Sequence, residues 1–234
     1  MNAPSNPTES LADGAARAWV AARCQRAYLH EVRGGLQALS GAFELLARLA
    51  RTRDGDAGVV DRATSIAKRA LANHEAAMIE LIKQITAAAD EQESVDLTAL
   101  IEDVLRFLRN DISARQLEIR FERDGSQRMC VDVPRHQLRL LLLGLISRQI
   151  DSIPPRSALS LRLAVRDGQA TLELGSPGGM RPAREAVSEE EADRVLDWAQ
   201  HWSAARGGGL EPVEGSSGML RWHLPLGSEP AAQA

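Results

Sequence analysis

The sequence predicts an α+β protein in which a long antiparallel helical hairpin precedes an α/β sandwich, a mixed sheet with helices on one face. Three observations predict this fold class. Residues 11–51 and 59–89 carry apolar side chains at helical spacing and contain no proline. From residue 93 onward, short alternating segments stand between further helical patterns. Aromatic residues make up only 3% of the chain, so the core must be aliphatic.

The first helix has one apolar stripe whose members are spaced four, three, four and three residues apart: Val32, Leu36, Leu39, Phe43 and Leu46. A polar, glycine-containing break at residues 52–58 has the length of a connection between antiparallel helices. The second helix repeats the spacing, and His74 lies on its stripe, where we expect a packed histidine. Because a hairpin cannot bury two such stripes alone, we expect a homodimer that forms a four-helix bundle.

His30 occupies a different face of the first helix. At about 100° per residue, it lies roughly 160° from the middle of the stripe. Glu31 is adjacent and Arg33 lies one turn further along. An exposed imidazole in this setting exchanges protons and small charged groups near neutral pH. Taken alone, the same pattern also fits an ordinary surface histidine.

The sandwich elements follow from local signals. Asp96 is expected to cap a helix over residues 97–116, and Pro134 to open a helix that ends before Pro154. Strands are expected at 117–121, 130–133, 159–165, 170–174, 210–213 and 219–226, with a helix at 189–205 capped by Ser188. Trp198 and Trp202 share one face of that last helix and are expected in the core.

Four regions result: a disordered N-terminus at 1–10, the hairpin at 11–92, the sandwich at 93–227 and a disordered tail at 228–234. The net charge of −4 and the scattered arginines argue against nucleic-acid binding. Cys24 and Cys130 have no metal-ligand spacing and are expected reduced. The apolar run at 140–146 is too short to cross a membrane, and no signal peptide is recognised, so we expect a cytoplasmic protein.

The segment from His30 to Leu46 resembles the phosphoacceptor box of two-component sensor histidine kinases, which typically reads His-Glu-Leu-Arg-Asn-Pro-Leu-Thr. The domain order strengthens the resemblance, which covers Leu11 to Gly227 and implies a Bergerat-like ATP-binding sandwich. It implies that His30 is phosphorylated and that Glu31 acts as the neighbouring base. It makes Arg33 a candidate contact for the phosphoryl group or a partner, and response-regulator receiver domains the expected partners.

The chain departs from this family at the residues that carry its chemistry. Gly34 and Gly35 replace the Asn or Thr and the Pro that follow the histidine. Gly144 replaces the first asparagine of the ATP-binding helix, and Arg148 replaces the asparagine that holds Mg²⁺. The Asp-x-Gly-x-Gly turn is degenerate from Gly175 to Gly179, with Gly175 in place of the adenine-reading carboxylate. A guanidinium offers no lone pair to a metal, so binding of ATP and Mg²⁺ is predicted lost and no cofactor is expected.

Three functions remain open on these grounds. In the first, the chain is a phosphorelay histidine phosphotransferase that moves phosphoryl groups between receiver aspartates through His30 without ATP. Alternatively, it is a divergent histidine kinase whose sensor lies in another polypeptide. The third reading is a non-enzymatic pseudokinase scaffold that binds a response regulator or a partner sensor kinase.

Overall fold

The computed structural model describes residues 11–51, 57–86, 92–125, 128–176, 189–216 and 218–227. The chain divides into two compact units, Met1–Ala21 together with Ala89–Ala234, and Ala22–Ala88. The predictions of a disordered N-terminus and tail and of the cap at Ser188 fall outside the described residues. Of the break predicted at 52–58, residues 52–56 also fall outside them, whereas residues 57 and 58 are not part of a loop but begin helix α2. Within the described residues, none of the helices combines the length and the apolar character that a membrane span requires.

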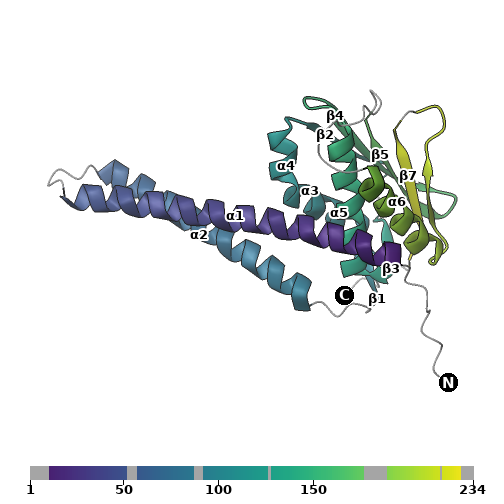
Figure 1. Cartoon of the computed structure of the whole chain (residues 1–234), viewed down its shortest axis with the longest axis horizontal. Helices are drawn as coiled ribbons and strands as arrows, with labels where there is room; N and C mark the ends of the chain where they lie inside the picture. Colours follow the sequence, from purple (N-terminus) through teal and green to yellow (C-terminus); the bar gives the residue numbers. More distant parts are fainter. Residues whose placement is uncertain are drawn as a thin grey trace, which may run out of the picture. The chain divides into compact units, whose positions relative to one another are not determined.

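The unit Ala22–Ala88 contains most of one long helix and the whole of a second. Helix α1 spans Leu11–Arg51 and helix α2 spans Ala57–Thr86 (Figure 1). The apolar spacing therefore predicted both helices, although α2 begins at Ala57 and not at residue 59, and its expected end at residue 89 lies beyond the described part. A helix 30 residues long cannot be held by propensity alone, so its apolar positions need neighbours to pack against.

The other unit contains a five-stranded sheet in the order β2-β4-β5-β7-β6. Its strands are β2 (Glu118–Arg123), β4 (Ala158–Arg166), β5 (Gln169–Gly175), β6 (Gly209–Pro212) and β7 (Leu220–Pro225). β2 and β4 are parallel and the remaining pairs are antiparallel. The predicted mixed sheet is confirmed.

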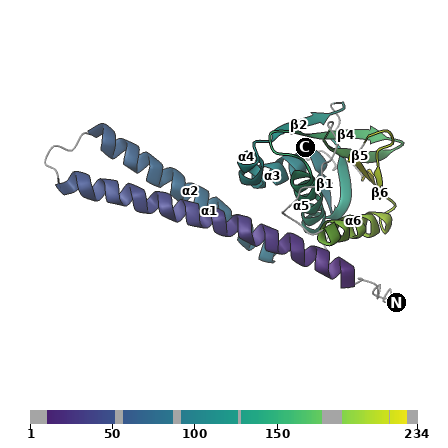
Figure 2. The ribbon, with the colours of Figure 1, turned by 45° about the horizontal axis from the view of Figure 1, so that its top comes forward.

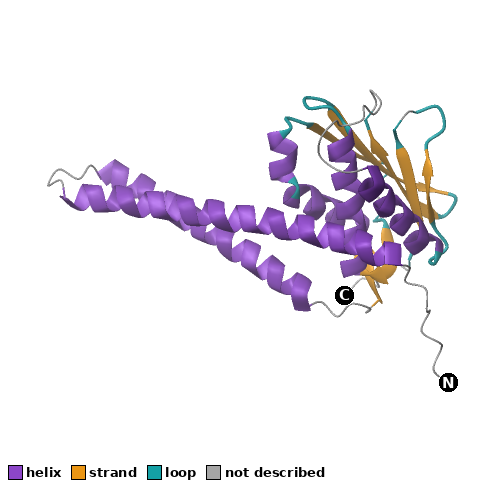
Figure 3. Cartoon of the chain, viewed as in Figure 1, coloured by secondary structure: helices purple, strands orange, loops and turns teal. Residues whose placement is uncertain are grey.

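The helices of this unit are α3 (Leu97–Phe107), α4 (Arg109–Ala114), α5 (Arg135–Ser152) and α6 (Glu189–Ala204). α3, α5 and α6 lie on one face of the sheet (Figures 2 and 3). α5 is the central helix, because apolar side chains on every side of it are buried. Trp198 and Trp202 on α6 are also buried, as predicted.

Two details differ from the sequence-based expectation. The charged segment before Asp96 is a strand, β1 (Gln92–Asp96), which pairs antiparallel with β3 (Cys130–Pro134). The helix expected at 97–116 breaks at Leu108, whose backbone leaves the helical conformation between α3 and α4. The predicted cap is correct: the Asp96 carboxylate accepts hydrogen bonds from the backbone N–H of Thr98 at 2.9 Å and of Ala99 at 3.3 Å.

Candidate functional site

The expected phosphoacceptor residues lie in α1. The side chains of His30 and Glu31 fall outside the described part of the structure, whereas Arg33 is described and exposed. Gly34 and Gly41 lie on the same side of the helix as position 30, and a Cβ added at either would meet no atom within 4 Å. The face of α1 that carries positions 30, 34 and 41 is therefore open at its described positions.

The contact between α1 and α2 is made where side chains are small. Ala42, Ala63 and Ala70 are buried, and a Cβ added at Gly35 would lie 3.7 Å from the Ala70 carbonyl oxygen. His74 is half-buried against the same glycine, as expected from its place on the stripe. Small residues let the two backbones approach closely at these positions, while larger side chains such as Val32 and Leu39 are half-buried.

Several large apolar side chains of the two helices are exposed on the single chain. Leu29, Leu36 and Phe43 follow one another at seven-residue intervals on α1 and are exposed by 67%, 54% and 64%. Val60 and Leu71 are exposed on α2. Residues seven apart share one side of a helix. Leu29, Leu36 and Phe43 therefore form one apolar row on the exposed surface of α1.

Gly144 stands on α5, where the resemblance expects the first asparagine. A Cβ at this position would lie 3.0 Å from Cγ2 of Val20 and 3.1 Å from Cγ1 of Val195, with the Trp198 ring at 3.8 Å. The space that a side chain would need is already filled by two valines. This part of α5 is therefore closed at the position where the resemblance expects the asparagine.

Arg148 lies one turn beyond Gly144, at the position expected to hold Mg²⁺. Its guanidinium is largely buried and lies 3.9 Å from the carboxylate of Asp193 on α6. Burial lowers the pKa of Arg148, and the charge of Asp193 opposes that shift. A cationic donor cannot replace an oxygen ligand. Within the described residues, no three histidine, cysteine or acidic side chains gather in a metal-binding arrangement.

Gly175 ends β5, where the resemblance expects the adenine-reading carboxylate. Its φ of +153° favours glycine, and an added Cβ would lie 2.7 Å from the Gly218 carbonyl oxygen and 2.8 Å from Cα of Met219. The backbone before β7 therefore occupies the place of a side chain here. Gly179, the other degenerate position of this turn, falls outside the described residues.

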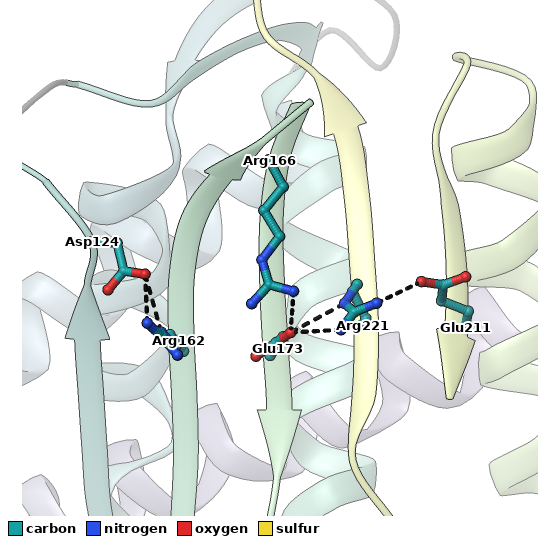
Figure 4. Close-up of polar contacts among 6 residues, drawn as sticks. All are labelled: Asp124, Arg162, Arg166, Glu173, Glu211 and Arg221. Carbon is teal, nitrogen blue, oxygen red and sulfur yellow. Dashed lines mark hydrogen bonds and ion pairs between the residues drawn. The ribbon is translucent and has the colours of Figure 1, made fainter. Parts of the chain in front are cut away.

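The helix-free face of the sheet carries an arrangement that the sequence did not reveal. One charged residue from each strand is aligned in register across all five strands, and the charges alternate in sign: Glu122, Arg162, Glu173, Arg221 and Glu211. Arg162 also binds Asp124 through its guanidinium, with an Nη2–Oδ2 distance of 2.8 Å (Figure 4). We call this set the charged row.

Glu173 is the centre of the charged row and is its most buried member, 9% exposed. Its Oε1 accepts from Arg166 at 2.9 Å and from two nitrogens of Arg221 at 3.0 and 3.1 Å (Figure 4). Arg221 also donates to Glu211 at 3.1 Å. Its hydrogen bonds with Glu173 and Glu211 raise the pKa of Arg221. Every guanidinium here has a carboxylate partner, and such cross-strand pairs of opposite charge stabilise a sheet.

In three dimensions the chain is similar to histidine kinases. It matches histidine kinase AdeS of Acinetobacter baumannii at 14% identity and a TM-score of 0.45, over 85% of this chain and 98% of that one. It matches histidine kinase ThkA, in complex with response regulator protein TrrA, at 14% identity and a TM-score of 0.46, over 95% of this chain and 68% of that one. It matches full-length ShkA in complex with AMPPNP at 18% identity and a TM-score of 0.49, over 92% of this chain and 47% of that one. No protein-family model and no curated protein matches the sequence.

Proposed function

We propose that this chain is a histidine phosphotransferase of a two-component phosphorelay, which accepts and donates phosphoryl groups at His30 without using ATP. The resemblance of the His30 segment to a phosphoacceptor box suggests the chemistry. The proposal that ATP is not used rests on the positions where the resemblance expects nucleotide-binding side chains, because the space there is closed. Gly144 and Gly175 have no side chain, and the space beside each is filled by other parts of the chain.

The electrostatics at Arg148 support the same choice. Mg²⁺ at this position would face a buried guanidinium, and two cations repel each other most strongly where water is excluded. Replacing one residue would not restore the site, because the metal ligand, the first asparagine and the adenine reader are all absent. A transfer that takes its phosphoryl group from another protein needs none of these three.

The proposed reaction consists of two balanced transfers. A ring nitrogen of neutral His30 attacks the phosphorus of an aspartyl phosphate on one receiver domain. The N–P bond forms as the P–O bond to the aspartate breaks, and the carboxylate leaves with the electron pair. Glu31 holds the proton of the other ring nitrogen. In the second transfer, an aspartate carboxylate of another receiver attacks the same phosphorus, and the N–P electron pair returns to the imidazole.

The apolar row Leu29, Leu36 and Phe43 supports a homodimer as the working form. On both helices, the exposed apolar residues lie beside the face that joins α1 to α2 and do not coincide with it. Two adjacent contact faces per helix are what a four-helix bundle of two hairpins requires. Helical spacing places position 30 on neither of these faces of α1, which supports the proposal that a receiver reaches it there.

The experiment uses receiver domains from the same genome, each carrying a ³²P-labelled aspartyl phosphate. The wild-type chain is expected to gain label from at least one receiver, and His30→Gln is expected to gain none. His74→Gln is the matched control, because it removes a histidine that packs against α1 from the neighbouring helix. It should keep the label.

The other readings predict different outcomes. Labelling of His30 from [γ-³²P]ATP and Mg²⁺ would overturn the proposal in favour of a divergent kinase. A chain that binds a receiver but gains label from no phosphorylated receiver is a scaffold. Equal labelling of wild type and His30→Gln would place the phosphoryl group on another residue.

A further inference from the structure

Strand β2 forms one edge of the five-stranded sheet, and β4 is the single described strand that pairs with it. The opposite edge, β6, is only four residues long and ends in Pro212, and both features keep a foreign strand from pairing. β2 keeps an unbroken parallel register with β4 over residues 118–123 and contains no proline. Its Ile119 and Phe121 side chains are half-buried. Within the described residues, the sheet is therefore protected at one edge and open at the other.

The free edge of β2 presents backbone hydrogen-bonding groups at every second residue. The N–H of Glu118 donates to the Ser157 carbonyl at 3.0 Å, and the N–H of Asp124 donates to the Leu163 carbonyl at 2.8 Å. The even-numbered residues therefore bond to β4. Because the backbone groups of successive residues in a strand point to opposite sides, those of residues 119, 121 and 123 face the free edge.

The side chains of the even-numbered residues share the helix-free face and alternate in sign: Glu118, Arg120 and Glu122. Charges on an edge strand repel a second strand unless it offers opposite charges. An antiparallel second copy of β2, with Phe121 opposite Phe121, places Arg120 of each copy opposite Glu122 of the other. In this register residues 119 and 123 also meet, so the free backbone groups face each other. Placing residue 119 opposite residue 121 would instead set Arg120 against Arg120 and Glu118 against Glu122.

We propose that the free edge of β2 binds the same edge of a second copy of this chain, in the register that places Phe121 opposite Phe121. The pairing joins two five-stranded sheets into one continuous sheet. The alternating signs of the charged row continue across the junction, because Glu122 meets Arg120 of the other copy. This association does not rest on the proposed phosphoryl transfer, and it involves a different part of the chain from the proposed contact between hairpins.

The first test exchanges charges in the full chain carrying Phe43→Glu, which is expected to separate the hairpins. Sedimentation velocity measures self-association over a range of concentrations; if the hairpins stay associated, the same comparison applies to the further doubling of mass. Arg120→Glu and Glu122→Arg each set like charges opposite each other, so each variant alone should self-associate on the order of tenfold more weakly than the parent. Mixed together, the two variants should associate, because each supplies the charge that the other lacks.

Two results of the charge exchange would overturn the proposal. One is a parent chain whose mass does not change with concentration. The other is a mixture of the two variants that associates no better than either variant alone.

The second test asks whether backbone hydrogen bonds make the contact. Arg123→Pro removes an N–H that faces the free edge and takes no part in the pairing with β4. Arg123→Ala is the matched control, since it removes the same side chain and keeps the N–H. Arg123→Pro should lose self-association while its thermal unfolding stays close to that of Arg123→Ala, which should associate as the parent does. Equal self-association of the two variants would refute a strand-to-strand contact.

Discussion

Gly144→Ala tests the closure of α5 with a single methyl group. In an open helix, this change is worth about 1 kcal/mol of stabilisation, because alanine has the higher helix propensity. At Gly144 the new Cβ would lie 3.0 and 3.1 Å from two valine methyl groups, closer than ordinary contact. Overpacking of this kind costs about 1–3 kcal/mol. The net expectation is a loss of about 0–2 kcal/mol of unfolding free energy.

The assay is urea and thermal unfolding followed by far-UV circular dichroism. Gly34→Ala is the matched control, since its Cβ meets nothing within 4 Å, and it should raise the stability by up to about 1 kcal/mol. For a chain of this size, 1 kcal/mol corresponds to about 2–4 °C in Tm. The two substitutions are chemically identical and differ only in the space around the new methyl group. Gly34→Ala should therefore raise Tm, whereas Gly144→Ala should lower Tm or leave it nearly unchanged.

A double variant identifies the atoms responsible. Val20→Ala removes the methyl group nearest to the new Cβ, so Gly144→Ala should be better tolerated in the Val20→Ala background than in wild type. Contacting residues couple in this way and distant ones do not. If Gly144→Ala stabilised the protein as much as Gly34→Ala does, the α5 face would be open and the steric argument against a nucleotide there would fail.

Three further predictions concern charge and assembly. Glu173→Gln should lower the free energy of urea unfolding by about 1–3 kcal/mol, because it weakens a buried acceptor shared by two arginines. Glu211 is a more exposed member of the charged row, so Glu211→Gln should lower it by less than about 1 kcal/mol. Burial, and then the charges of Arg139 and Arg17, lower the pKa of His136 below its usual 6.5, so the free energy of unfolding should fall as the pH drops below about 6.5. In His136→Gln this fall should be smaller, and an unchanged dependence of stability on pH would contradict the role given to His136. Phe43→Glu should convert the proposed dimer into monomers in light scattering, while Gln37→Glu, which adds the same charge to another face of α1, should leave it intact.

Local signals predicted most elements of this fold. The long helices were predictable because 3.6-residue periodicity is a property of the segment itself, and the cap at Asp96 because its hydrogen bonds are made two and three residues away. Strand β1 was missed because only Val95 of its five residues is buried, which leaves no alternation to detect. It is a strand because β3 lies beside it, and that partner is more than thirty residues away.

The candidate site divides in the same way. The sequence showed which side chains are absent at positions 144, 148 and 175. It did not show that Val20, Val195 and the backbone before β7 fill the space at the two glycines, because those contacts join segments far apart in the chain. The charged row was hidden for the same reason, since its alternation runs across strands and not along them.

The sequence by itself determined the helical periodicity, the resemblance of the His30 segment to a phosphoacceptor box, and which residues stand at positions 144, 148 and 175, where the resemblance expects other polar side chains. The tertiary structure decided that the space beside Gly144 and Gly175 is filled and that the largest exposed apolar residues described on α1 form one row. The physical reason is that periodicity and residue chemistry are local, whereas the filling of space depends on which distant segments meet.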